Sequence, residues 1–100
     1  WYKRHLNWAE EMLGFKPLQE LPSHYVRENI HFTVQYERVA VEMRHHVGVD
    51  HIMFATDFRH IENEWPNSRP IIDEIYENVP ADEKHKMWAG NAVKYFKLDA

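Results

Sequence analysis

The sequence V-D-H-I-M-F-A-T-D-F-R-H, residues 49–60, decides how the fold of the whole chain is interpreted. Residues 52–54 form a short apolar run, two small residues follow it, and an acid stands at Asp57. A continuous apolar run between polar residues is typical of a strand buried on both faces, as in a parallel sheet. We therefore predict a strand over residues 49–56, with Asp57 at its carboxyl end.

Asp57 needs a partner if it lies at the buried end of that strand. Burying a carboxylate costs several kcal/mol unless a hydrogen-bond donor, a cation or a metal compensates for the lost water. The alternative is that Asp57 closes the following turn through its own side chain, as Asp commonly does. The residues alone favour this second interpretation, because acids at strand ends are more often structural than catalytic.

Four further stretches have the spacing of apolar residues that predicts a helix. They are residues 1–14, residues 37–47 up to Gly48, the stretch from Ser68 to the break at Pro80, and residues 82–96. Ser68 is the expected N-cap of its helix. In the last stretch we expect Gly90 to break the helix and Asn91 to cap it again, without a chemical role.

The alternation I-H-F-T-V-Q predicts a second strand over residues 30–35, after a short turn of helix that Ser23 is expected to cap. Strands separated by a single helix imply parallel pairing through a right-handed crossover. Two parallel strands cannot bury their faces alone. The chain, residues 1–100 without an internal domain boundary, is therefore expected to be a piece of a larger α/β barrel or open sheet. Its start at Trp1 rather than Met supports that expectation.

Composition excludes several functional classes. The chain has 100 residues, of which 44% are hydrophobic, so it has the material for one small core. Its net charge of -4 argues against a nucleic-acid partner, which needs a basic face. Its apolar runs are far shorter than the roughly 20 residues that cross a bilayer, so no membrane partner is expected. The absence of Cys fits a cytoplasmic protein.

Several stretches together resemble a known family. They are L-P-S-H-Y-V-R-E-N-I-H-F-T (21–33), H-I-M-F-A-T-D-F-R-H (51–60), E-W-P-N-S (64–68), N-V-P-A-D-E-K (78–84) and A-G-N-A-V-K-Y-F (89–96). The pattern resembles the C-terminal end of the amidohydrolase superfamily, in the amidohydrolase-related branch that includes aminocarboxymuconate-semialdehyde decarboxylase. The resemblance implies a TIM (β/α)₈ barrel, in which residues 30–35 and 49–56 would be strands seven and eight. Residues 1–14 would then be the sixth helix.

The resemblance also implies a role for Asp57. It places Asp57 on the family's acid after strand eight, which is a ligand of a divalent metal, with zinc the expected ion, and a proton acceptor. His60 would bind the substrate at the mouth of the site, although an exposed loop imidazole is the alternative. Trp65 either closes over the active site or packs under its own loop. Arg59 departs from the pattern, because the family usually has proline there.

The family's other metal-binding histidines would all precede Trp1. The isolated chain is therefore expected neither to bind the catalytic metal tightly nor to turn over a substrate. The eight histidines of the chain do not reproduce a zinc-finger spacing, and His51 is interpreted as a surface or helix-face residue. His31 could face either layer of its strand.

Two functional classes remain open at this point. The first is the C-terminal part of a metal-dependent hydrolase or non-oxidative decarboxylase acting on a small carboxylated or cyclic substrate. The parent enzyme would supply the missing N-terminal barrel portion, and a homodimeric parent is compatible with this reading. The second is a catalytically silent fragment or interaction module that self-associates through its strand edges.

Overall fold

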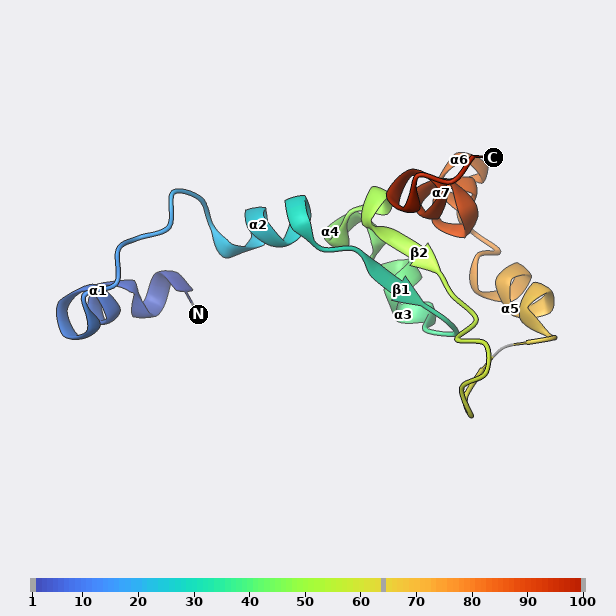
Figure 1. Ribbon diagram of the computed structural model, residues 1–100, viewed down its shortest axis with the longest axis horizontal. Coiled ribbons are helices and arrows are strands. Elements are labelled where there is room, and N and C mark those ends of the chain that lie inside the picture. The colour runs from blue at the N-terminus through green and yellow to red at the C-terminus, as the bar shows by residue number, and fades with distance from the viewer. Residues whose placement is uncertain (1, 64, 100) are drawn as a thin grey trace. The chain divides into compact units, whose positions relative to one another are not determined.

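A computed structural model describes residues 2–63 and 65–99 of the chain. The chain forms two compact units, residues 1–30 and residues 31–100, and each is described by itself (Figure 1). The expectation of a chain without an internal domain boundary stays a prediction. Among the described residues, no helix is long and apolar enough to cross a membrane.

The first unit contains two helices, α1 (Tyr2–Leu13) and α2 (Pro22–Asn29). Helix α1 confirms the predicted first helix over its described part, and Trp1 lies outside the described residues. The prediction that Ser23 caps α2 is wrong, because the helix begins one residue earlier with Leu21 at the N-cap. Proline explains this start, since its fixed φ suits the first helical position and its missing N–H loses no bond there.

The second unit is built on two short parallel strands, β1 (Phe32–Val34) and β2 (Ile52–Phe54). Their register pairs Phe32 with Ile52 and Val34 with Phe54. The predicted parallel pairing is confirmed, but both strands are shorter than predicted. The 3₁₀ helix η1 (Val49–His51) takes the beginning of the second predicted strand, directly after Gly48 at a φ of 110°.

Two helices of different length replace the single helix predicted over residues 37–47. They are α3 (Arg38–Glu42) and α4 (Arg44–Val47), and the chain bends between them at Met43, where ψ is 7°. Helix α5 (Ser68–Ile75) follows the loop after β2. The prediction that Ser68 is its N-cap is wrong, because Asn67 takes that position and Ser68 is the first helical residue.

The C-terminal helix runs without a break from α6 (Ala81–His85) through the π-helical turn η2 (Lys86–Gly90) into α7 (Asn91–Phe96). Gly90 keeps right-handed helical angles, with φ −57° and ψ −43°. The predicted break at Gly90 and recapping by Asn91 are therefore wrong. The π turn accommodates an extra residue without interrupting the helix. Figure 1 shows α6 and α7 beside β2, and η2 contacts that strand.

The core of the second unit lies between the sheet and these helices. It contains seven buried hydrophobic residues: Val34, Val41, Ile52, Ile75, Tyr76, Val79 and Met87. Val34 and Ile52 face this core together with Phe54, because alternate residues of paired strands share one face. The core fixes the sheet against α3, α5 and η2, and thereby sets where the two ends of each strand lie.

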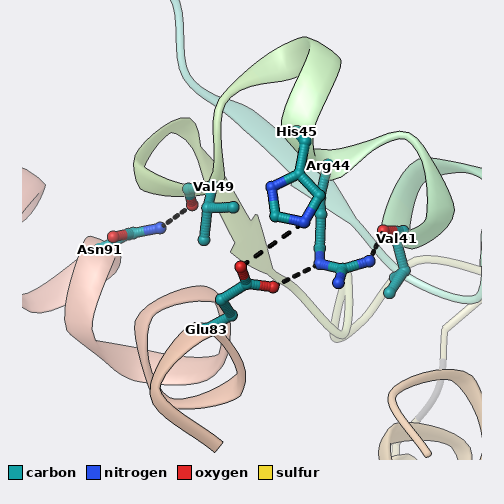
Figure 2. Close-up of polar contacts among 6 residues, drawn as sticks. All are labelled: Val41, Arg44, His45, Val49, Glu83 and Asn91. Atoms are coloured by element: carbon teal, nitrogen blue, oxygen red, sulfur yellow. Dashed lines mark hydrogen bonds and ion pairs between the residues drawn. The ribbon is translucent and has the colours of Figure 1, made fainter. Parts of the chain in front are cut away.

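An ion pair at the rim of this core links α4 to α6. Arg44 Nε donates to Glu83 Oε2 at 2.6 Å, and Arg44 Nη1 donates to the Val41 carbonyl oxygen at 3.1 Å. His45 Nε2 lies 3.5 Å from the other carboxylate oxygen of Glu83 (Figure 2). The side chains of Arg44 and Glu83 are only 15% and 18% exposed, so water screens this pair less than a surface pair.

Candidate functional site

Asp57 lies just beyond the carboxyl end of β2, three residues after Phe54. The pairing with β1 continues one residue past the strand, where the Ala55 N–H donates to the Val34 carbonyl oxygen at 2.9 Å. Asp57 then adopts a φ of 53°, in the left-handed region. Asp tolerates this conformation better than most residues, but such backbone still costs about 1–3 kcal/mol and is concentrated at functional sites.

The side chain of Asp57 is half exposed, at 51%. Within the described part of this chain the carboxylate is therefore not buried. The reason is that the described part of the sheet has two strands, and the loop that carries Asp57 turns away from the helices that cover the core. Solvent compensates the carboxylate here.

A four-residue turn follows directly from Asp57 to His60. The His60 N–H donates to the Asp57 carbonyl oxygen at 2.9 Å, so the backbone of Asp57, rather than its side chain, closes the turn. Arg59, in the third position, has a φ of 77°. Proline is locked near −65° and cannot adopt this angle, so the loop differs in shape from one with proline in that position.

Asp57 and His60 also approach each other through their side chains. Asp57 Oδ2 lies 3.6 Å from His60 Nδ1, and the same nitrogen accepts a hydrogen bond from the Glu62 N–H at 3.3 Å. While Nδ1 accepts that bond it carries no proton, so it offers none to the carboxylate. Protonation of the imidazole converts the contact into an ion pair, but both side chains are more than half exposed and such pairs contribute little stability.

Trp65 forms an exposed aromatic surface with Phe58 in the same loop. The two rings meet edge to face, with centroids 6.0 Å apart, and 61% of Trp65 is exposed. Arg59 places its guanidinium carbon 5.6 Å from the centroid of the Phe58 ring. Trp65 is thus not packed under its loop. The loop presents two aromatic rings and a cation to solvent beside Asp57.

The residues present do not make a complete metal centre. Across residues 2–63 and 65–99, no group of three or more His, Cys, Asp or Glu side chains is arranged to hold a metal ion. Asp57 and His60 are two candidate ligands, whereas a catalytic site uses about three protein ligands and an open position. The described residues therefore supply at most part of such a metal site.

Asn91 has a structural role that its sequence context did not indicate. It is 5% exposed, and its Nδ2 donates to the carbonyl oxygens of Val49 and Ile52, each at 2.7 Å. Figure 2 shows the first of these bonds joining α7 to the segment before β2. An Asn after Gly is also typical of a helix cap, so the sequence alone could not distinguish the two roles.

Residues 4–98 match a family model described as Amidohydrolase. The chain belongs to the amidohydrolase family. Amidohydrolases are a TIM-barrel family of hydrolase-type enzymes that generally use divalent metals. A search of curated proteins gave no match to this chain. In barrels of this kind the active site lies at the carboxyl ends of the strands, which is the end of β2 where Asp57 is found.

Proposed function

We propose that this chain is the C-terminal part of a metal-dependent amidohydrolase barrel, with β1 and β2 as strands seven and eight and α1 as the sixth helix. The observation that carries the proposal is the position of Asp57 directly after a parallel strand, in a chain that matches the family over residues 4–98. The reaction is either hydrolysis or non-oxidative decarboxylation. The resemblance to the aminocarboxymuconate-semialdehyde decarboxylase branch supports the second.

Asp57 is the residue that would perform proton transfer in this enzyme. Its carboxylate is accessible, sits on a turn held by the His60 N–H, and has no competing hydrogen bond within the described residues beyond the contact with His60. A divalent ion, zinc by expectation, would lower the pKa of a bound water when the parent enzyme supplies the remaining ligands. Asp57 would contribute one ligand and accept the proton.

The side chains of the loop beside Asp57 suit a small substrate that is carboxylated or cyclic. Phe58 and Trp65 offer apolar rings on which a planar substrate can pack. Arg59 has no ion-pair partner among the described residues, so its guanidinium is available to a substrate carboxylate. His60 would contact the substrate at the mouth of the site.

The test is to compare Asp57→Asn with Asp73→Asn in the full-length enzyme, measuring turnover and bound divalent metal. Asp57→Asn keeps the shape but removes the proton acceptor, so kcat should fall about 10²–10⁴-fold. Asp73 lies on α5 in an exposed pair with Arg69, so its variant should keep full activity. Circular dichroism of both variants checks that each is folded.

Retained turnover in a folded Asp57→Asn enzyme would rule out the proposed role. The barrel assignment would fail if the 100-residue chain alone were a monodisperse monomer carrying its own stoichiometric metal.

A further inference from the structure

A cavity lined in part by polar side chains lies at the other end of the two strands, away from Asp57. Its volume is about 250 Å³, and six residues line it: His31, Asp50, His51, Asn91, Lys94 and Tyr95. All six belong to the second unit. They come from the residue before β1, the 3₁₀ helix before β2, and α7. The proposed amidohydrolase chemistry uses none of them.

The strand register explains why the two histidines meet. His31 directly precedes Phe32, His51 directly precedes Ile52, and Phe32 pairs with Ile52 across the sheet. The two imidazole rings consequently have centroids 4.8 Å apart. The ring of Tyr95 lies 4.6 Å from that of His31 and closes the third side. His51, expected on the surface or on a helix face, is partly buried in η1 and lines this cavity.

Each of the two imidazole rings has one buried nitrogen atom. The Nδ1 atoms of His31 and His51 are both buried and have no hydrogen-bond partner among the residues that the structure describes. Protonating Nδ1 would leave a buried N–H, or a buried imidazolium, without an acceptor, and burial penalises both. The favoured tautomer of each ring therefore carries its proton on Nε2, which leaves each ring with an Nε2–H as its donor.

Two cations, Lys86 and Lys94, act on the one carboxylate that lines the cavity, Asp50. Lys86 Nζ lies 2.9 Å from Asp50 Oδ1, and this bond lowers the pKa of Asp50 and raises that of Lys86. The Asp50 carboxylate is thus neutralised by Lys86. Lys94 lowers the pKa of Asp50 through its charge, but it has no carboxylate within ion-pair distance among the described residues, so its ammonium can still donate to a ligand.

The helical wall of the cavity is anchored. Asn91, at the start of α7, bonds the carbonyl oxygens of Val49 and Ile52 on either side of His51. The π-helical turn η2 comes immediately before Asn91, and such turns recur at functional sites. These contacts hold Lys94 and Tyr95, three and four residues further along α7, over the two histidines.

We propose that this cavity binds a small anion with oxygen acceptors, a carboxylate or an inorganic phosphate. The Lys94 ammonium supplies the charge, and the Nε2–H groups of His31 and His51 donate hydrogen bonds. A metal ion fits less well, because the nearest carboxylate is committed to Lys86 and no group of three metal-binding side chains is found in the described residues.

The experiment follows the imidazole Cε1–H resonances of the full-length protein by NMR. The pH is held constant, and a chloride salt keeps the ionic strength constant during each titration. Inorganic phosphate and acetate are titrated separately, which distinguishes the two sources of the anion. Saturable shifts of His31 and His51 with either anion are the expected result. His24 and His46 are exposed and lie outside the cavity, so their resonances should not saturate.

Lys94→Met provides the decisive variant, and Lys97→Met is its matched control. Losing one charge-assisted hydrogen bond should weaken anion binding about tenfold in Lys94→Met, whereas Lys97→Met should bind as the parent does. Equal shifts in all histidines, an unaltered affinity in folded Lys94→Met, or saturation by Zn²⁺ but by neither anion would overturn the proposal.

Discussion

The two ends of the β1–β2 sheet are built in different ways. At the carboxyl end, Asp57 and Arg59 adopt positive φ angles in a loop whose side chains are mostly exposed. At the amino end, Asn91 ties the chain around the start of β2 to α7 through two hydrogen bonds, one buried and one partly buried. In TIM barrels the carboxyl end carries catalysis and the amino end carries stability. The contrast predicts that substitutions at the two ends affect different quantities.

The largest expected effect on stability belongs to Asn91→Ala. Its loss leaves the Val49 and Ile52 carbonyl oxygens without their side-chain donor, which should reduce the free energy of unfolding by about 2–4 kcal/mol. Urea denaturation measures the change, with the exposed Asn78→Ala as the control. If Asn91→Ala lowered the free energy of unfolding by less than Asn78→Ala does, Asn91 would not anchor the amino end of the sheet. The proposed contrast between the two ends would then fail.

A smaller effect is expected from the Arg44–Glu83 pair. Arg44→Met removes the partner of a carboxylate that is 18% exposed, so unfolding should become easier by about 1–2 kcal/mol. Arg38→Met breaks the Arg38–Glu74 pair, whose side chains are about half exposed, and should cost less than about 0.5 kcal/mol. The two variants are compared in the same denaturation experiment. Equal losses in the free energy of unfolding would show that the greater burial of the Arg44–Glu83 pair does not increase its contribution to stability.

The smallest effect concerns the hydroxyl of Tyr76. Tyr76 is buried, its hydroxyl has no hydrogen-bond partner, and burial raises its pKa from 10.0 to about 12. Because the unfolded chain loses this proton at lower pH than the folded one, stability should be intact below pH 10 and fall as the pH rises toward 12.

Tyr76→Phe removes both the unpaired hydroxyl and its titration. Stability at neutral pH should stay equal or rise by up to about 1 kcal/mol, and its decline above pH 10 should become shallower. Thermal unfolding at several pH values measures both. An unchanged alkaline slope in Tyr76→Phe would show that other groups control it.

The parts of the fold that depend on local patterns could be predicted from the sequence. Apolar runs and helical spacing located both strands and the helices around them. The helical stretch predicted between the strands, which forms α3 and α4, implied the parallel pairing that is observed. The caps could not be assigned in this way. Ser23 and Ser68 suit an N-cap chemically, yet the N-cap lies two residues earlier in α2, at Leu21, and one residue earlier in α5, at Asn67.

The contacts that depend on register and helix continuity could not be predicted. The neighbouring positions of His31 and His51 follow from the pairing of Phe32 with Ile52, which no local pattern in either strand fixes. The role of Asn91 depends on a π turn that carries the helix through Gly90. The role of Asp57 stays a prediction that comes from the family resemblance, because a position after a strand is equally typical of an acid that closes a turn.

The most direct test of this account measures kcat and the free energy of unfolding for both Asp57→Asn and Asn91→Ala in the full-length enzyme. We predict that Asp57→Asn lowers kcat by about 10²–10⁴-fold with little change in the free energy of unfolding. Asn91→Ala should lose stability while its folded fraction keeps its turnover. The opposite pattern, with an active Asp57→Asn enzyme or an Asn91→Ala enzyme that is stable but inactive, would contradict the assignment of catalysis to the carboxyl end.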